Sequence, residues 1–470
     1  TRISYVKFDD PSNLMTLTKM ILLLLLLPSA VLTGQILIET PSAGMDGDSL
    51  MAYMDQQDQD IKTYLDVAEK EARISSNPRL GGTSKKGKAE ALILAQEENE
   101  AIETTKNKIL SMDEKEIDEI KKAVFEFLVI RHFNLARRFG VEEKNQVDPL
   151  IVFEKEIEQY EFLHPLKESQ FDYDAYAAYN GSLSVLGLEG SAAHYEDSMK
   201  QLEIDFYKYA HGQMDLGNNE CASICASRLS NQSMLGLLAL FLATIFFYLN
   251  ALDFRKTKMN ILYCSLSVSR TKIYLIKFFA LFVVYGGIVF LAFFLPVIAC
   301  GVTFGFENML EPALIDTGFI TSYRAHADVL YDGYVQYSPC LSQVTPGNDM
   351  GYPFLNLNLA VIPLGIQLLI QFALMIMEIL CVGIFVYYLA MCIKRSSVIV
   401  GICLFGILLT RIQYVPVVSL IPLFYPNPPY LLVGGHGIGW IPLISMSVLF
   451  ILFWFFAGVR QYRKTLLYWD

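Results

Sequence analysis

Charge is scarce in this sequence, because Asp, Glu, Lys and Arg make up 18% of its 470 residues. Ordinary soluble domains carry roughly 25%. Hydrophobic residues reach 53% and the mean hydropathy is +0.37, so a wholly soluble protein is excluded. Chemical motifs are missing too. The chain has no G-x-x-x-x-G-K-[ST] phosphate loop, no H-E-x-x-H, no G-x-S-x-G and no Cys/His cluster at zinc spacing. We therefore expect no catalytic site, metal or cofactor in the chain itself.

The charge that is present is unevenly distributed. Residues 39–232 hold 21 of the 37 Lys and Arg residues and 37 of the 48 Asp and Glu residues, a net charge of −16. The remainder of the chain carries a net charge of +5. The sequence therefore predicts an acidic, soluble domain attached to a membrane-embedded part. Nucleic acid is excluded as a partner, because the main polar surface would repel phosphate.

Long apolar runs account for the other half of the chain. A membrane-spanning helix needs about 20 mostly apolar residues to cross the hydrocarbon core. The sequence offers six such segments: 20–38, 233–252, 273–304, 359–393, 398–416 and 441–459. The third and fourth are too long for one upright span. We expect each of them to tilt, to break near its proline (Pro296 or Pro363), or to continue as a helix beyond the lipid.

The distribution of cations predicts the orientation of these spans, since cytoplasmic loops are rich in Lys and Arg. With the N-terminus inside, the cytoplasmic segments, together with Lys277 just beyond the second of them, hold 14 Lys and Arg residues against four Asp residues. The outer loop 305–358 holds Arg324 against six acidic residues. Both termini are thus expected inside and the acidic domain outside. The cytoplasmic segments are 1–19, 253–272, 394–397 and 460–470.

The first apolar segment has an alternative interpretation. Lys19 followed by an apolar run would also suit a cleaved signal peptide. Asp9 and Asp10 interrupt the basic leader that such a peptide needs, so we expect a retained first span.

Residues 39–232 are expected to be mainly helical. Helices are predicted over 50–74, 149–163 and 192–209, and a long helix over 88–139, where apolar residues recur near a heptad spacing. One interpretation is a helical bundle in which the apolar stripes form its own core. The alternative is that the long helix pairs with a second copy of the chain.

The second cytoplasmic segment, 253–272, is basic and contains a Ser-x-Ser-Arg turn at 267–270, followed by Ile273 and Lys277. This pattern resembles the permeases of type-2 ABC transporters, although Ser267 replaces the usual proline and the usual Gly-Thr pair upstream is missing. In that family the segment forms a coupling helix that docks on a cytosolic ATPase. The resemblance implies that role for Asp253, Arg255, Lys256, Lys258, Ser269, Arg270 and Lys272.

A second resemblance to the same family lies between the last two spans. Segment 417–440 looks like a re-entrant outer hairpin, with Pro422, Asn427, Pro428 and Pro429 as its marking residues. The alternative is an ordinary outer loop. The resemblance implies an all-α protein of six transmembrane helices that works with a second permease copy and a separate ATPase subunit, which binds ATP and Mg²⁺.

Polar residues within the fourth span form one predicted stripe. Gln367, Gln371 and Glu378 lie within about 40° of one another around a helix. Glu378 and Arg411 of the fifth span should reach similar depth, so we expect an ion pair between them. The alternative is that Arg411 reaches the outer headgroups and Glu378 is protonated in a helix interface.

The leading functional prediction is the membrane subunit of an ATP-driven exporter for an amphipathic substrate or peptide, in a bacterial plasma membrane. One alternative is a non-transporting scaffold or receptor with a helical outer domain. A third is an ion-coupled transporter that uses Glu378 as its proton carrier. The scarcity of acidic partners for Glu378 within the spans disfavours the third.

Overall fold

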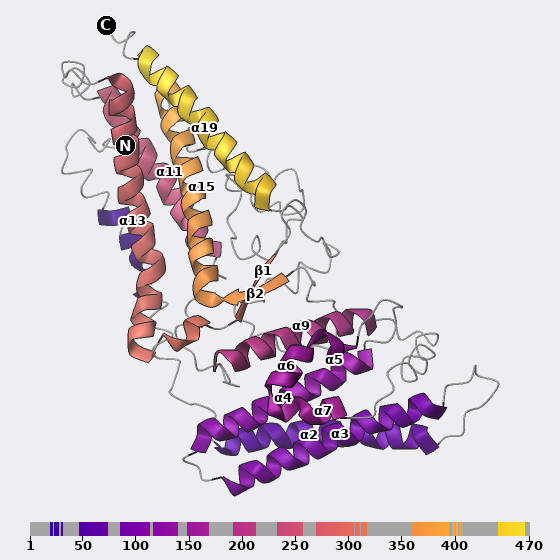
Figure 1. Ribbon diagram of the computed structural model, residues 1–470. Coiled ribbons are helices and arrows are strands. Elements are labelled where there is room, and N and C mark those ends of the chain that lie inside the picture. Colours follow the sequence, from indigo (N-terminus) through magenta and orange to yellow (C-terminus); the bar gives the residue numbers. More distant parts are fainter. Residues whose placement is uncertain are drawn as a thin grey trace, which may run out of the picture. The chain divides into compact units, whose positions relative to one another are not determined.

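The computed structural model describes two compact units of the chain (Figure 1). We call 42–219 with 344–361 the acidic unit, and 1–41, 220–343 and 362–470 the apolar unit. The described residues are nearly all helical, with one two-stranded sheet among them. They comprise 47–73, 85–112, 116–139, 148–168, 191–212, 233–256, 269–304, 306–310, 312–316, 359–393 and 440–465, with a few residues at 19–31 and 398–405.

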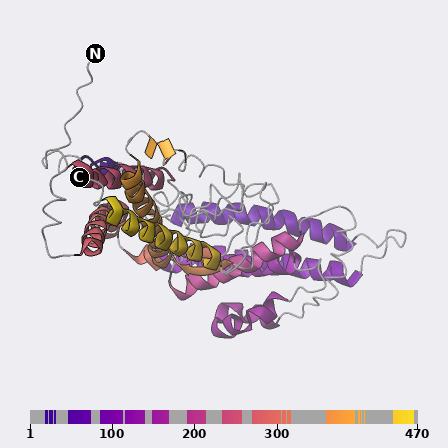
Figure 2. The same ribbon diagram turned by 90° about the horizontal axis from the view of Figure 1, so that it is seen from above.

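Four long helices make up most of the described part of the acidic unit, in line with the helical pattern of its sequence. They are α2 (Gly47–Arg73), α3 (Lys85–Ser111), α4 (Ile117–Phe139) and α9 (Ser191–Ala210). Helix α2 packs on α3, α3 on α4, and α4 on α9 (Figures 1 and 2). Apolar residues spaced three and four apart meet in the core between α2, α3 and α4.

The helix expected over 88–139 is interrupted. Helix α3 ends at Ser111 and α4 begins at Ile117 and packs back against α3. The apolar residues Ile102, Ile120 and Val124 are buried within the unit. The stripe therefore forms the unit's own core, and the alternative of one continuous helix pairing with a second copy loses its premise.

Three short helices replace the single helix expected over 149–163, and a fourth follows it. They are α5 (Pro149–Val152), α6 (Glu154–Gln159), η3 (Glu161–Leu163) and α7 (His164–Glu168). The first begins with a regular N-cap, because the Asp148 carboxylate accepts a hydrogen bond of 2.9 Å from the Leu150 N–H. These turns close a second core whose aromatic rings include Phe133, Phe153 and Phe206.

In the described part of the apolar unit there are four long helices: α11 (Ser233–Lys256), α13 (Arg270–Phe304), α15 (Leu364–Cys392) and α19 (Trp440–Thr465). Three of these are long and apolar enough to cross a membrane, over Thr271–Ala299, Leu364–Cys392 and Ile441–Lys464. In α11 the apolar stretch is shorter, Leu238–Ala251. The described part of the chain thus has the character of a helical membrane protein. The expected spans 20–38 and 398–416 lie mostly outside the described residues.

The two segments that are too long for one upright span, 273–304 and 359–393, differ at their prolines. Residues 359–363 form a strand, β2 (Leu359–Pro363), that pairs with β1 (Pro312–Asp316), so α15 begins at Leu364 rather than at 359. Proline lacks an amide hydrogen and suits the start of a helix, and Pro363 is its N-cap. The expected break at Pro363 is therefore present. In α13, by contrast, the helix continues through Pro296 to Phe304.

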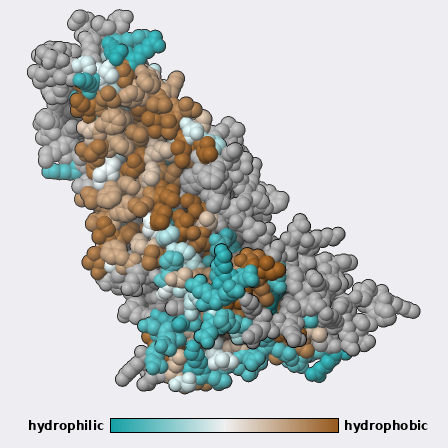
Figure 3. All heavy atoms as spheres, viewed as in Figure 1, coloured by the Kyte–Doolittle hydropathy of each residue, from teal (hydrophilic) through white to brown (hydrophobic). Residues whose placement is uncertain are grey.

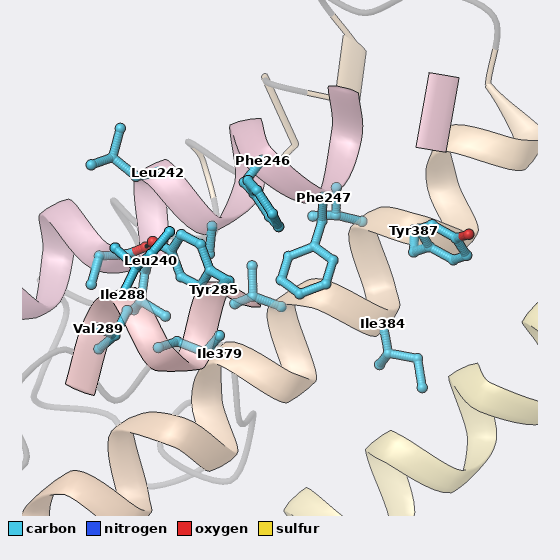
Figure 4. Close-up of a cluster of buried hydrophobic side chains, with 14 of the residues drawn as sticks. Leu240, Leu242, Phe246, Phe247, Tyr285, Ile288, Val289, Ile379, Ile384 and Tyr387 are labelled. Atoms are coloured by element: carbon cyan, nitrogen blue, oxygen red, sulfur yellow. Dashed lines mark hydrogen bonds between the residues drawn. The ribbon is translucent and has the colours of Figure 1, made fainter. Parts of the chain in front are cut away.

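The core of the apolar unit lies where α11, α13 and α15 meet. Phe246 and Phe247 of α11 approach Tyr285 of α13, with ring centroids 5.3 and 6.1 Å from the tyrosine ring (Figure 4). The Tyr285 hydroxyl donates a hydrogen bond to the Ala239 carbonyl. The described surface of this unit is predominantly hydrophobic, whereas that of the acidic unit is mostly hydrophilic (Figure 3). Apolar side chains on α13 and α19 remain exposed, and an apolar surface of this kind suits contact with lipid.

Candidate functional site

Helices α11 and α13 extend into the two ends of segment 253–272, which was expected to couple to an ATPase. Helix α11 continues to Lys256, so Asp253, Arg255 and Lys256 lie in its last turn and a half. Helix α13 begins at Arg270, so its first turn includes Lys272, whose side chain is exposed. Lys258 lies outside the described residues. Segment 253–272 is thus partly the ends of two apolar helices rather than a separate loop.

Ser269 starts α13. Its carbonyl oxygen accepts backbone hydrogen bonds from Lys272 at 2.9 Å and from Ile273 at 3.2 Å, which closes the first helical turn. The apolar helix and the end of the basic segment are therefore continuous. Any displacement of residues 269–272 moves the N-terminal end of α13 with them.

The start of α13 is also attached to α19. The guanidinium of Arg463 donates two hydrogen bonds to Thr271 Oγ1, at 3.2 Å from Nε and 2.7 Å from Nη2. We call this contact the Thr271–Arg463 clamp. It joins residues that are 192 positions apart in the chain, and no sequence motif predicts this contact.

Aromatic rings extend the clamp into the apolar unit. Tyr274 lies against Tyr387 of α15 and against Phe455 and Tyr462 of α19, with ring centroids 5.4, 6.1 and 5.7 Å apart. Its ring stacks on Phe278 one turn further along α13. We call these five residues the aromatic block. The block links α13, α15 and α19 near the ends that carry the cations, so the three helices are mechanically connected there.

Helices α13 and α19 lie close together beside the aromatic block. The Tyr274 ring lies over Gly458 of α19, and an added Cβ at position 458 would meet its hydroxyl oxygen and come within 3.0 Å of Cζ. Glycine is needed at 458 because the two helices cross closely there. A side chain at this position would fill the space that the Tyr274 ring occupies. The Tyr274 hydroxyl is buried and has no hydrogen-bond partner in the described part of the chain.

The second group of predicted residues lies inside α15. Gln367, Gln371 and Glu378 are 1%, 2% and 3% exposed, so the predicted polar stripe points away from the exposed face of the helix. The side chains on this face also include Leu374 and Cys381, which pack against Leu443 and Ser447 of α19. The polar stripe is therefore part of a helix–helix seam.

Two residues of the seam, Cys381 and Ser447, were not predicted from the sequence. Cys381 Sγ lies 4.0 Å from the Ser447 carbonyl oxygen, and Ser447 Oγ donates a 3.0 Å hydrogen bond to the Leu443 carbonyl. The signal available in the sequence was the offset of three from Glu378 to Cys381, which continues the stripe by one turn. Its partner on α19 could not be read, because the contact joins helices that are far apart in the chain.

The expected partner of Glu378, Arg411, lies outside the described residues, so the ion pair stays a prediction. The same holds for the re-entrant hairpin, whose marking residues Pro422, Asn427, Pro428 and Pro429 fall in that part of the chain.

The acidic unit has its own charge cluster between α2 and α3, in which only Asp58 is buried. Lys106 lies 2.6 Å from Asp55 and 3.0 Å from Asp58, and Lys62 lies 2.9 Å from Asp58. The hydrogen bonds to Asp55 and Asp58 raise the pKa of Lys106. Burial acts to raise the pKa of Asp58, but its bonds to Lys62 and Lys106 outweigh this and hold the pKa below its usual range. The cluster joins the two helices. Across the described residues, no group of three or more His, Cys, Asp or Glu side chains could hold a metal ion.

Comparison of the chain with protein-family models, curated proteins and solved structures gave no match. Function must therefore be argued from the residues and the geometry above.

Proposed function

We propose that this chain is the permease subunit of an ATP-driven exporter, resembling type-2 ABC transporters. Six spans place both termini and segment 253–272 in the cytoplasm of a bacterial plasma membrane. A separate ATPase subunit binds ATP and Mg²⁺ and docks on that segment, and a second permease copy completes the transport path. The cargo is an amphipathic molecule or peptide.

The observation that carries this proposal is the Thr271–Arg463 clamp with the aromatic block beside it. A coupling segment must pass a displacement to the membrane helices. Here the segment is continuous with α13, and the clamp and Tyr274 tie α13 to α19 and α15. Packed side chains transmit displacement because cores are dense and poorly compressible.

The first experiment is purification of the intact chain from its own membranes in a gentle detergent, followed by identification of the cytosolic proteins that remain bound. We expect a stoichiometric partner that carries a phosphate loop. Recovery of the chain without any ATP-hydrolysing partner contradicts the proposal.

With the partner in hand, Arg463→Gln tests transmission. The substitution removes the charge and the forked donor of the clamp, so we expect ATP hydrolysis to continue while its stimulation by cargo falls several-fold. Arg460→Gln is the matched control, because Arg460 lies one turn earlier on the same helix with an exposed side chain. Equal behaviour of the two variants would remove the clamp from the mechanism.

A non-transporting scaffold or receptor is the second candidate. It is favoured by the two closed cores of the acidic unit, which give that unit the means to fold by itself and to present a surface to other molecules. In that case the purification yields only outer or membrane partners.

A further inference from the structure

Glu378 is an acidic residue in the seam between the apolar helices α15 and α19. It lies at the fifteenth position of a 29-residue helix that is long and apolar enough to cross a membrane. Its side chain is 3% exposed, and Oε1 has no hydrogen-bond partner in the described part of the chain. An isolated carboxylate in such surroundings loses most of its solvation, which costs far more than keeping a proton.

The groups around Glu378 offer no compensating charge among the residues that the structure describes. On its own helix, the nearest titratable side chain is Cys381, one turn further on. The facing stretch of α19, from Leu443 to Trp454, contains no ionisable residue. On α11 and α13, which also pack on α15, the titratable side chains in the corresponding stretch are the tyrosines Tyr248 and Tyr285.

Packing shows what keeps water from this carboxyl group. Leu374 contacts Leu443, Cys381 lies against Ser447, and Phe385 lies against Trp454 with ring centroids 4.8 Å apart. These contacts are made one turn before Glu378, one turn after it and two turns after it. Glu378 is therefore enclosed along the seam as long as α15 and α19 stay packed.

We propose that Glu378 is a proton-binding site inside the membrane-embedded part of this protein. The carboxyl group is a neutral acid while α15 packs on α19, which is the alternative to an ion pair with Arg411. When the seam opens, the O–H bond breaks, the proton passes to a water molecule as hydronium, and a solvated carboxylate remains. The site takes a proton as its ligand and exchanges it only in the opened conformation. This inference does not depend on an ATPase partner.

Infrared spectroscopy of the full chain in lipid nanodiscs tests the proposal at neutral pH, where an exposed glutamate is ionised. We expect the spectrum of the wild-type protein minus that of Glu378→Gln to show loss of the carbonyl band of a neutral carboxylic acid. Loss of carboxylate bands instead overturns the proposal, because it means an ionised Glu378 held by a metal cation or by a basic residue. Glutamine has nearly the shape of the neutral acid, so the variant should fold.

Glu69→Gln is the matched control. Glu69 is partly exposed on α2 and lies 3.0 Å from Arg73, so its replacement should remove carboxylate bands and no acid band. A neutral-acid band lost in both variants would mean that the assignment to Glu378 is an artefact, and would overturn it.

Transfer of the wild-type protein into D₂O tests the enclosure by the seam. We expect the acid band of Glu378 to shift at least tenfold more slowly than the backbone amide bands of the exposed helix ends. Ser447→Phe inserts a ring into the seam and should accelerate the shift. A shift complete at the first time point in the wild type shows that water reaches the group freely and overturns the gated exchange.

Discussion

Gly458 is the position at which a single methyl group should test the packing of α13 on α19. A Cβ added there would meet the Tyr274 hydroxyl oxygen and come within 3.0 Å of Cζ and 3.6 Å of Cε2. The ring cannot simply swing away, because Tyr387, Phe455 and Tyr462 surround it. Gly458→Ala must therefore displace either the ring or the helix.

The magnitude follows from two opposing effects. Overpacking a close contact costs about 1–3 kcal/mol. Alanine in place of glycine inside a helix returns roughly 0.5–1 kcal/mol through its better helix propensity. We expect a net loss of about 1–2 kcal/mol. Gly287→Ala on α13 has nothing within 4 Å of the added Cβ and should instead gain up to about 1 kcal/mol.

The assay is thermal unfolding of the purified protein in one detergent, with Tyr274→Phe as the partner variant in a double-mutant cycle. Removing the buried hydroxyl, which has no hydrogen-bond partner among the described residues, should be neutral or stabilising. In that background Gly458→Ala should cost about 1 kcal/mol less than in the wild type, because the nearest remaining ring atom is Cζ. Equal melting temperatures for Gly458→Ala and Gly287→Ala, with no coupling to Tyr274→Phe, would refute the close crossing of the helices.

Two further predictions use other contacts. Gly383→Ala should destabilise the apolar unit by about 1–3 kcal/mol in the same assay, because the new Cβ would lie 2.8 Å from the edge of the enclosed Phe247 ring; an unchanged melting temperature would mean that α11 and α15 are further apart. Lys106→Met should lower the stability of the acidic unit by about 1–2 kcal/mol at neutral pH. Because the pKa of Asp58 is lowered by folding, its contribution is present above the unfolded pKa and is lost as pH falls through the folded pKa. The difference between wild type and Lys106→Met in chemical denaturation should therefore shrink below about pH 4, and a constant difference would contradict the ion pair.

The helices of the acidic unit were largely predictable, because the apolar spacing that defines them is local. The helices expected over 50–74 and 192–209 are found at Gly47–Arg73 and Ser191–Ala210. The interruption after Ser111 was missed, since neither glycine nor proline marks it. A signal was present in Asp113 and Glu116, which have the spacing of a capping box directly before the apolar run of α4.

The candidate sites were predictable only in part, for a similar reason. The stripe of Gln367, Gln371 and Glu378 follows from helical periodicity, and its burial could be inferred from the cost of placing such groups against lipid. The surfaces opposite the stripe and opposite Thr271 belong to α19, which comes later in the chain. Pairing of distant helices depends on shape and on small residues such as Gly458, and a single sequence does not encode these as a local pattern.

Helix α19 takes part in both the clamp and the seam, and this has a testable consequence. Arg463 and Ser447 are 16 residues apart on one continuous helix, or ~24 Å at about 1.5 Å per residue. A helix of this length moves nearly as a rigid body, so releasing its Arg463 end should loosen its contact with α15 at Cys381. We therefore expect Arg463→Gln to accelerate the D₂O shift of the Glu378 acid band several-fold, while Arg460→Gln leaves it unchanged. If the two variants exchange at the wild-type rate, the C-terminal end of α19 does not control the seam, and proton exchange at Glu378 must be opened by movement of α15 alone.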